Sequence, residues 1–286
     1  MCALVLVGDI MWHLNKIPKT LHVYWGGGKL PYLRYLTVAS FMRLNPTWEV
    51  VFYVPLSPIL HHSWNTPEQK HVEGYSDCLY MIKELRVTIR MINFKTLGFS
   101  NIASEVHKSD FIRWTILNKP GGLWADMDII FIRSMDELCF NKEEFSEVNT
   151  VVCRGSYGHS IGFLMGGEGN TYFDTIYRAS LKNYNKNEYQ CIGSLLCNRL
   201  FPTIASTQAN GTIPYNLPMD VVYPYDFNSF KELFTKTSID RFTENTIGVH
   251  WYGGSKIAGA YLNNTNGGLN THGNSIIDKL IRNESK

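Results

Sequence analysis

The chain has 286 residues, of which 44% are hydrophobic and 18% are charged. This composition provides enough apolar material for a sizeable core and excludes an intrinsically disordered chain. The net charge of +2 gives no strong field for nucleic acid or an anionic membrane, so no nucleic-acid partner is expected. The six cysteines form no CxxC pair, which argues against a zinc site or a disulfide framework and predicts reduced thiols.

The first nine residues are apolar, but they lack a basic region and end in Asp9. They make a poor signal peptide or membrane anchor and are interpreted as part of the folded domain or as a short interfacial segment. No later stretch is long and apolar enough for a transmembrane segment. N-glycosylation sequons begin at Asn210, Asn263 and Asn283, but a chain rich in Asn and Thr produces such triplets by chance. We expect a cytoplasmic protein, with the Golgi lumen or membrane association as the alternative.

Strand and helix patterns alternate through the first half of the chain. The predicted elements are a strand at 20–25, a helix from about 31 to 45, a strand at 49–54, a helix at about 68–85 and a strand at 87–94. Asn45 and Pro46 mark the end of the first helix, because proline cannot continue it. This order is typical of an α/β fold with a mostly parallel sheet.

A helix, a sharp turn and an apolar run follow in the middle of the chain. Ser104 is expected to cap a helix that ends near 118, and a Pro-Gly-Gly turn at 120–122 leads into a predicted strand at 123–132. The second half is less regular. Its predicted elements are strands at 148–153, 161–165 and 246–251 and helices at 172–184, 190–200 and 275–282.

Two acids, Asp126 and Asp128, stand two residues apart within the run at 123–132. On an extended strand they share one face, and two carboxylates so close together need a cation to remain ionised. Mn²⁺ or Mg²⁺ takes oxygen ligands and binds phosphate oxygens beside one or two carboxylates. The preceding helix and turn put the pair at the carboxyl end of a strand, where α/β folds bind ligands. For a DxD triplet alone, a solvated strand end is the alternative.

A two-part motif surrounds the pair of acids. The segment SDFIRW at 109–114 is followed by GGLWADMD at 121–128. It resembles the SD-x-x-R and GG-x-Y-x-D-x-D signature of DXD-containing sugar transferases, a family that includes Golgi mannosyltransferases, capsular polysaccharide enzymes and large glucosylating toxins. The resemblance implies a GT-A fold, which is an α/β fold with a Rossmann-like mixed central sheet flanked by helices and an acceptor-side subregion. It also implies a nucleotide-sugar donor and transfer of a hexose with retention of configuration.

The resemblance extends to the first strand. The segment IPKTLHVYWGG at 17–27 is similar to the family's opening IPK-x-IH-x-x-W segment, whose tryptophan stacks on the nucleotide base. Trp25 is therefore the predicted stacking residue, with core packing as the alternative, and His22 is expected to be structural. The residues predicted to contact the donor are Val23, Tyr24, Trp25, Gly26, Asp126, Met127 and Lys256.

Asp110 and Arg113 are predicted catalytic residues. They are three apart in a predicted helix and so lie on one face, and in the family they hold the donor sugar and phosphate. An ion pair within the helix is the alternative. Gln190 is a third candidate, because the segment at 190–195 lies where the family has a TGP-like helix start. Ile192 and Ser194 depart from that pattern, and a surface position at a helix start is the alternative for Gln190.

The segment HWYGGSK at 250–256 resembles the closing motif of glycogenin-type and bacterial galactosyl transferases, in which the histidine binds metal and the lysine binds diphosphate. We therefore predict a metal site made of Asp126, Asp128 and His250, and a diphosphate contact from Lys256. Asp128 is the expected direct ligand, while Asp126 bridges ribose and sugar hydroxyls or reaches the metal through water. Ile257 departs from both relatives, so a solvated lysine in a glycine-rich loop is the alternative for Lys256.

These predictions describe one GT-A domain over 1–286, with a nucleotide-sugar-binding half at 1–135 and an acceptor-binding half with the closing motif at 136–286. The expected donor is a UDP- or GDP-sugar, and the expected acceptor is a glycan or glycoconjugate. Two other function classes stay open. A metal-dependent sugar nucleotidyltransferase or diphosphate hydrolase would add a phosphate-binding glycine loop or further acids. A non-catalytic glycan-binding descendant would not need the metal-binding residues to be intact.

Overall fold

The computed structural model describes residues 16–26, 28–60, 74–138, 147–203 and 212–284. The apolar start at 1–9, Gly27 and the sequon at Asn210 lie outside these residues. The cysteines within them are buried free thiols, as expected: Cys78, Cys153, Cys191 and Cys197. None of the helices in the described ranges combines the length and the apolarity needed to cross a bilayer.

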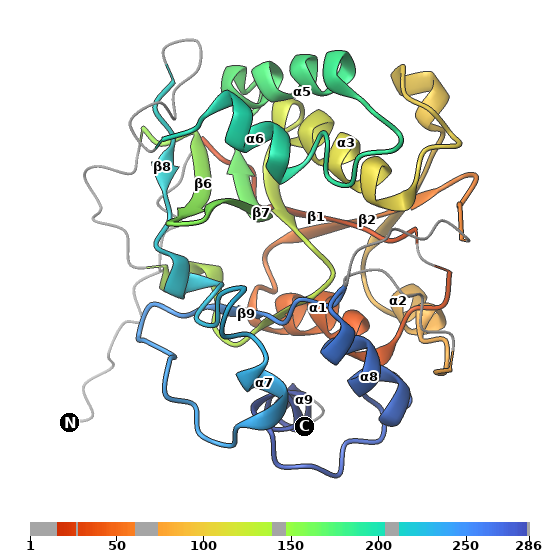
Figure 1. Cartoon of the computed structure of the whole chain (residues 1–286), viewed down its shortest axis with the longest axis vertical. Coiled ribbons are helices and arrows are strands. Elements are labelled where there is room, and N and C mark those ends of the chain that lie inside the picture. Colours follow the sequence, from red (N-terminus) through yellow and green to blue (C-terminus); the bar gives the residue numbers. More distant parts are fainter. Residues whose placement is uncertain (1–15, 27, 61–73, 139–146, 204–211, 285–286) are drawn as a thin grey trace, which may run out of the picture.

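A seven-stranded mixed sheet forms the centre of the protein (Figure 1). Its strands, in spatial order, are β3 (Thr88–Ile92), β2 (Glu49–Pro55), β1 (Thr20–Tyr24), β4 (Gly122–Ala125), β7 (Gly158–Gly166), β6 (Thr150–Gly155) and β8 (Tyr215–Asn216). The first four run parallel, while β7 is antiparallel to both β4 and β6. The expected α/β class with a mixed central sheet is confirmed.

The strand order reverses at β1. The chain leaves β1 to form β2 on one side and later places β4 on the other side, parallel to β1. The carboxyl ends of β1 and β4 are therefore neighbours at a topological switch point. Open α/β sheets bind their ligands at such points, because the connecting loops diverge there and leave a crevice.

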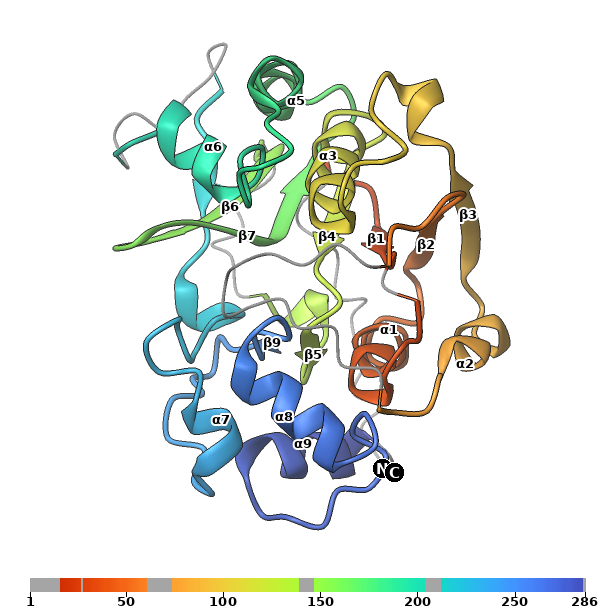
Figure 2. The ribbon, with the colours of Figure 1, turned by 45° about the vertical axis from the view of Figure 1, so that its right-hand side comes forward.

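Helices cover both faces of the sheet (Figures 1 and 2). On one face, α3 (Glu105–Asn118), α5 (Thr171–Asn183) and α6 (Ser194–Leu200) enclose an aromatic core. The other face carries α1 (Tyr32–Leu44) and a separate two-stranded sheet of β5 (Ile129–Phe131) and β9 (Gly248–His250). Around that small sheet pack α7 (Glu232–Thr235), α8 (Lys256–Asn264) and α9 (Ile276–Glu284).

Local sequence signals account for the first half of the chain. α1 ends at Leu44, before Pro46, and Ser104 caps α3 by accepting a hydrogen bond from the His107 amide. At the turn into β4, Gly121 and Gly122 have φ of 86° and 118°, which side chains rarely adopt. A Cβ on Gly121 would also lie 2.6 Å from the Gly166 carbonyl oxygen. The predicted strands at 20–25, 49–54 and 87–94 and the first and third helices are confirmed by the observed element bounds.

Three predicted elements are wrong in extent. The strand predicted at 123–132 is broken between β4 and β5, which belong to different sheets. The helix predicted at 68–85 is helical, within its described part, only as α2 (Leu79–Glu84), because the Asp77 carboxylate accepts from the Leu79 amide and ends the preceding loop. α6 begins at Ser194 instead of at Gln190, since Gln190 has a left-handed φ of 55°.

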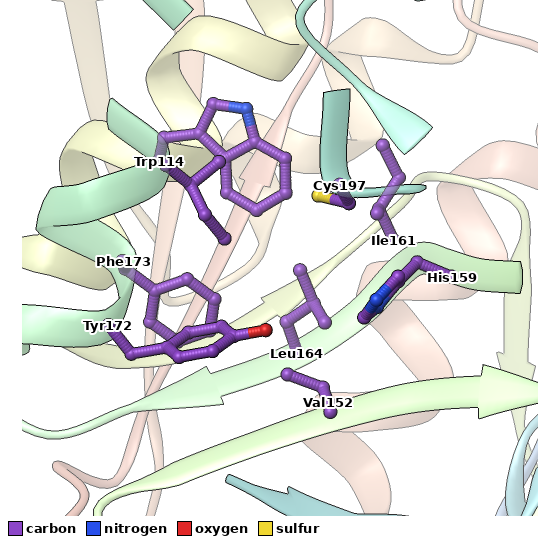
Figure 3. Close-up of a pocket in the computed structure, with 9 residues that line it drawn as sticks. Trp114, Val152, His159, Ile161, Leu164, Tyr172, Phe173 and Cys197 are labelled. Atoms are coloured by element: carbon purple, nitrogen blue, oxygen red, sulfur yellow. The ribbon is translucent and has the colours of Figure 1, made fainter. Parts of the chain in front are cut away.

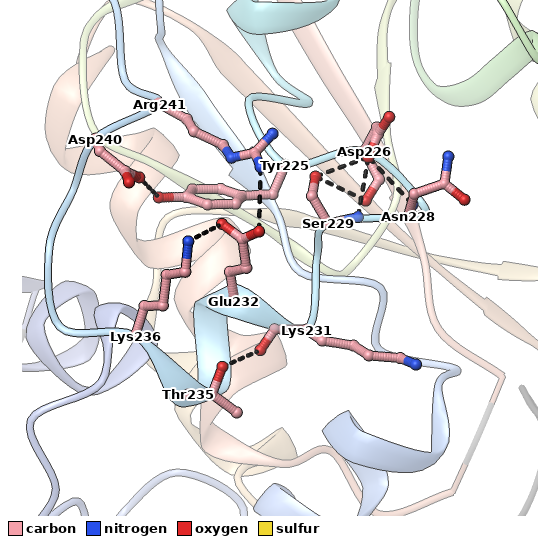
Figure 4. Close-up of polar contacts among 10 residues, drawn as sticks. All are labelled: Tyr225, Asp226, Asn228, Ser229, Lys231, Glu232, Thr235, Lys236, Asp240 and Arg241. Atoms are coloured by element: carbon pink, nitrogen blue, oxygen red, sulfur yellow. Dashed lines mark hydrogen bonds and ion pairs between the residues drawn. The ribbon is translucent and has the colours of Figure 1, made fainter.

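The loop before α7 is shaped by a polar network (Figure 4). Glu232 forms ion pairs with Lys236 and Arg241, and the Arg241 guanidinium lies over the Tyr225 ring. The Asp226 carboxylate accepts from the Ser229 hydroxyl at 2.7 Å and closes the turn that follows. This turn places Phe230 with its ring centroid 4.8 Å from that of Tyr252, so the network supports the segment just after β9.

A small cavity lies in the core between the three upper helices and strands β6 and β7 (Figure 3). Trp114, Phe173 and Leu164 supply apolar walls, and the Tyr172 hydroxyl and the His159 ring also face it. Its volume is about 10 Å³, which holds one water molecule at most. It is too small for a sugar or a nucleotide.

Candidate metal and donor site

The residues Asp126, Met127 and Asp128 carry the chain from the central sheet to the small sheet (Figure 2). The Asp126 amide donates to the Gly162 carbonyl at 2.7 Å, and the Asp128 carbonyl accepts from the Trp251 amide at 2.9 Å. The two acids are therefore brought together by a crossing between sheets, and the expectation that they share the face of one strand is wrong. The Met127 side chain is buried in the core, so it offers a ligand only its backbone.

Asp126 is held from the α3 side. Its Oδ1 accepts from Arg113 Nη2 at 2.8 Å and from Trp124 Nε1 at 2.9 Å. Arg113 Nη1 in turn lies 3.2 Å from Asp110 Oδ1. Burial raises the pKa of Asp110 to about 7, while Arg113 acts in the opposite direction and Asp126 adds to the rise. Asp110 and Arg113 are each 3% exposed, so the arginine serves two carboxylates inside the protein.

Asp128 is held from the β9 side. Its Oδ1 lies 3.1 Å from His250 Nε2, and its Oδ2 accepts from the Gly253 amide at 2.8 Å. Burial alone would raise the pKa of Asp128. His250, Arg34 and the Gly253 amide outweigh that effect and hold the pKa of this carboxyl well below its usual range.

Ligand atoms of Asp126, Asp128 and His250 all lie within 4.8 Å of one another, and within the described ranges no other such trio of acids, histidines or cysteines occurs. Apart from the ion pair, Asp128 Oδ1 takes no hydrogen bond from the described residues. A buried carboxylate facing an imidazole nitrogen is satisfied either by a proton on the histidine or by a cation that both groups ligate. Two carboxylates and one imidazole suit Mn²⁺ or Mg²⁺, so the residues fit the predicted metal.

Trp25 directly follows β1 and is half-buried beside the end of β4. Its Nε1 donates to the Gly28 carbonyl at 3.0 Å. The side chains of Val23 and Tyr24, which are also predicted to contact the donor, do not face the site. Val23 is fully buried and the Tyr24 hydroxyl donates to Glu105, so the side chains of both belong to the core. A Cβ on Gly26 would lie 1.9 Å from the Glu105 carboxylate, which explains the glycine by packing.

The remaining predicted site residues are Gln190 and Lys256. Gln190 is half-buried just before α6, and its Oε1 accepts from the Ser194 hydroxyl at 2.6 Å. The same segment approaches α3, since a Cβ on Gly193 would lie 2.4 Å from Asp110 Oδ2. Lys256 is exposed and is the first residue of α8, so the glycine-rich loop expected there ends one residue earlier, at the capping Ser255.

His22 has the structural role expected of it. Its Nε2 donates to the Gly121 carbonyl at 2.9 Å, and its Nδ1 lies 3.1 Å from the Tyr53 hydroxyl. Burial lowers the pKa of His22 to about 4, with Gly121 acting against this and Arg90 adding to it. The imidazole thus fixes the turn that leads into β4.

Two side chains at the site were missed from the sequence. Tyr223 is buried with its ring 5.1 Å from that of His250, and a Cβ on Gly162 would lie 3.0 Å from both the Tyr223 hydroxyl and Asp126 Oδ2. Arg34 lies with its guanidinium carbon 5.0 Å from the ring centroid of Trp25 and 5.2 Å from that of Trp251. Neither belongs to a motif, and Lys29 instead of Arg34 directly follows the glycines at 26–28, so no local pattern indicates either residue.

Fold and site together define the class of DXD-containing glycosyltransferases. A model described as the glycosyltransferase sugar-binding region containing the DXD motif matches residues 36–145, which include Arg113 and both acids. A second model, described as capsular polysaccharide synthesis protein, matches residues 91–252 and so covers more than half of the chain, including His250. The chain belongs to the family of capsular polysaccharide synthesis proteins.

Individual relatives are similar over parts of the chain. The glycosyltransferase afumC of Aspergillus fumigatus is 38% identical over 63 residues, which are 21% of this chain and 16% of that protein's length. Among solved structures, the PaToxG glycosyltransferase has a TM-score of 0.46 at 15% identity over 66% of this chain and 70% of its own. The galactosyltransferase LgtC has a TM-score of 0.41 at 14% identity, over 81% of this chain and 86% of its own.

Proposed function

We propose that the protein is a metal-dependent glycosyltransferase that moves a hexose from a UDP- or GDP-sugar to a hydroxyl group of a glycan or glycoconjugate, with retention of configuration. One observation carries the proposal. Asp126, Asp128 and His250, distant in sequence, offer ligand atoms within 4.8 Å of one another. They do so beside the switch point of the sheet, where a nucleotide is expected to bind.

Different residues of the site would bind different parts of the donor. When bound, Mn²⁺ or Mg²⁺ would supply positive charge for the leaving diphosphate. Asp128 and His250 would hold it directly, and Asp126 would hold it directly or through water. Trp25 presents an aromatic face for the base, and Lys256 offers an ammonium group at the start of α8. Arg113 acts at one remove, by fixing Asp126.

Retention is consistent with attack from the face that the diphosphate leaves. The bond between the anomeric carbon and the phosphate oxygen breaks, the bond to the acceptor oxygen forms, and the hydroxyl proton passes to the departing phosphate oxygen. This route needs no protein base. A double displacement would instead need a nucleophile on the opposite face, and Gln190 is the candidate because its segment adjoins Asp110.

Donor hydrolysis tests the proposal. Purified protein is incubated with UDP- and GDP-hexoses, with and without Mn²⁺, and the release of nucleoside diphosphate is measured beside a thermal-shift screen of the same donors. We expect slow, metal-dependent release from one donor and its loss in Asp128→Ala. Release of a sugar phosphate instead would identify a nucleotidyltransferase or diphosphate hydrolase. Binding without any release would identify a non-catalytic descendant.

A further inference from the structure

The guanidinium of Arg34 lies between the two aromatic residues of the donor site. Arg34 is in the first turn of α1 and is half-buried. Its guanidinium carbon is over the ring of Trp25, which follows β1, and over the ring of Trp251, which follows β9. Segments from opposite ends of the chain thus meet at one arginine.

The same guanidinium lies close to the metal-binding carboxylate. A Cβ on Gly253 would come 2.6 Å from an Arg34 Nη atom, so the glycine permits this approach. The Gly253 amide donates to Asp128 Oδ2. The arginine is therefore separated from the predicted metal ligand by the backbone of a single residue.

Arg113, the arginine that the sequence predicts to hold the donor phosphate, is already paired with two carboxylates. Arg113 is buried, donates a hydrogen bond to Asp126 and forms an ion pair with Asp110. The Arg34 guanidinium, by contrast, forms no hydrogen bond or ion pair with a side chain or backbone group in the described ranges. A guanidinium that stacks on aromatic rings keeps its N–H groups free in its own plane, and that fork of donors matches two phosphate oxygens.

We propose that Arg34 binds the diphosphate of the nucleoside diphosphate, beside the metal carboxylate Asp128. The inference rests on the proposed function and adds a residue to it. Arg34 takes the phosphate-binding part predicted for Arg113, while its contact with Trp25 links the diphosphate to the base-stacking residue. The two carboxylates and His250 would hold the metal, and Arg34 would neutralise part of the phosphate charge beside it.

Binding measurements on the full chain with Mn²⁺ test this role. UDP, GDP and the matching nucleosides are titrated against the wild type, Arg34→Gln and Arg34→Lys, with exposed Arg43→Gln at the other end of α1 as the matched control. We expect Arg34→Gln to weaken nucleoside diphosphate binding by about ten-fold or more and to leave nucleoside binding unchanged. Arg34→Lys keeps the charge but not the fork and is expected to fall between, with a raised donor KM and a smaller change in kcat.

Equal diphosphate affinity in Arg34→Gln and wild type would overturn the inference. So would a proportional loss of nucleoside and diphosphate binding, because it would mean that Arg34 only supports Trp25. If Arg34→Gln does not fold, Arg34→Lys decides by the same comparison. A wild type that binds neither nucleotide and releases no nucleoside diphosphate overturns the proposed function itself. This result differs from that of an active wild type in which the Arg34 variants bind diphosphate normally.

Discussion

The two acids of the DxD triplet are two residues apart but are held by different halves of the molecule. Asp126 is fixed from the central sheet by Arg113 and Trp124, in a cluster that also contains buried Asp110. Asp128 is fixed from the small sheet by His250 and the Gly253 amide. In the first set one buried arginine pairs with two acids, whereas the second leaves a carboxylate oxygen and an imidazole nitrogen facing each other.

The difference separates stability from chemistry. Removing a member of a buried charge network leaves an uncompensated charge, which costs folding free energy. Removing a group that faces a ligand costs binding and turnover instead. We therefore expect variants on the Asp126 side to act mainly on stability and variants on the Asp128 side to act mainly on activity.

Asp128→Asn should have the largest effect on activity. The amide keeps the shape and the hydrogen bond from Gly253, but it is a poor ligand for a hard divalent cation. We expect metal-dependent donor hydrolysis to fall by about 100-fold or more. The free energy of unfolding should fall as well, because the contacts that depress the pKa of Asp128 stabilise the folded protein at neutral pH. Asp174→Asn, on α5, is the control. Turnover equal to that of the wild type across a Mn²⁺ titration would show that Asp128 is not a ligand.

Arg113→Gln should have the largest effect on stability. It leaves Asp110 and Asp126 without their shared cation, and we expect the free energy of unfolding in urea to fall by about 3–5 kcal/mol. Arg178→Gln is the matched control, since Arg178 also pairs with an acid on its own helix but is exposed. We expect no measurable change there. Similar losses in both variants would mean that the buried ion pairs stabilise the fold no more than an exposed pair does.

The pH dependence of stability tests the turn on the Asp126 side. Below its ordinary pKa of 6.5, His22 takes up a proton in the unfolded chain but not in the folded protein until about pH 4. The free energy of unfolding should therefore fall as pH drops from 6.5 towards 4, by up to about 3 kcal/mol from this group. In His22→Gln this part of the acid slope should disappear, whereas exposed His272→Gln should keep it. Urea titrations between pH 7 and 4.5 provide the measurement.

Gly253→Ala should have the smallest effect and falls on the Asp128 side. The added methyl group would lie 2.6 Å from Arg34 and 2.8 Å from the Trp251 ring, so the loop or the arginine must shift. We expect about a ten-fold rise in donor KM with the unfolding midpoint nearly unchanged. Ala at the exposed neighbour Gly254 is the control. A loss of stability without any change in KM would place Gly253 among the structural residues.

The first half of the fold was predictable because its signals are local. The cap at Ser104, the stop at Pro46 and the glycine turn before β4 act on their own neighbours, so the sequence indicates where these elements begin and end. The break at Asp126 was not predictable. The run on either side of the two acids is uniformly apolar, and only pairing with β7 before the break and with β9 after it divides the run.

By itself, the sequence determined which residues can bind a metal and the α/β class. It did so because the DxD triplet, the SDxxR segment and the HxxGxxK segment are short local patterns, and the strand and helix patterns alternate along the chain. Only the tertiary structure decided how these residues divide their work. It engages Arg113 between two acids, buries the side chains of Val23, Tyr24 and Met127, and brings Arg34 to Trp25 and Trp251. These contacts join segments far apart in sequence, and such contacts follow from how the sheets and helices pack and leave no local pattern.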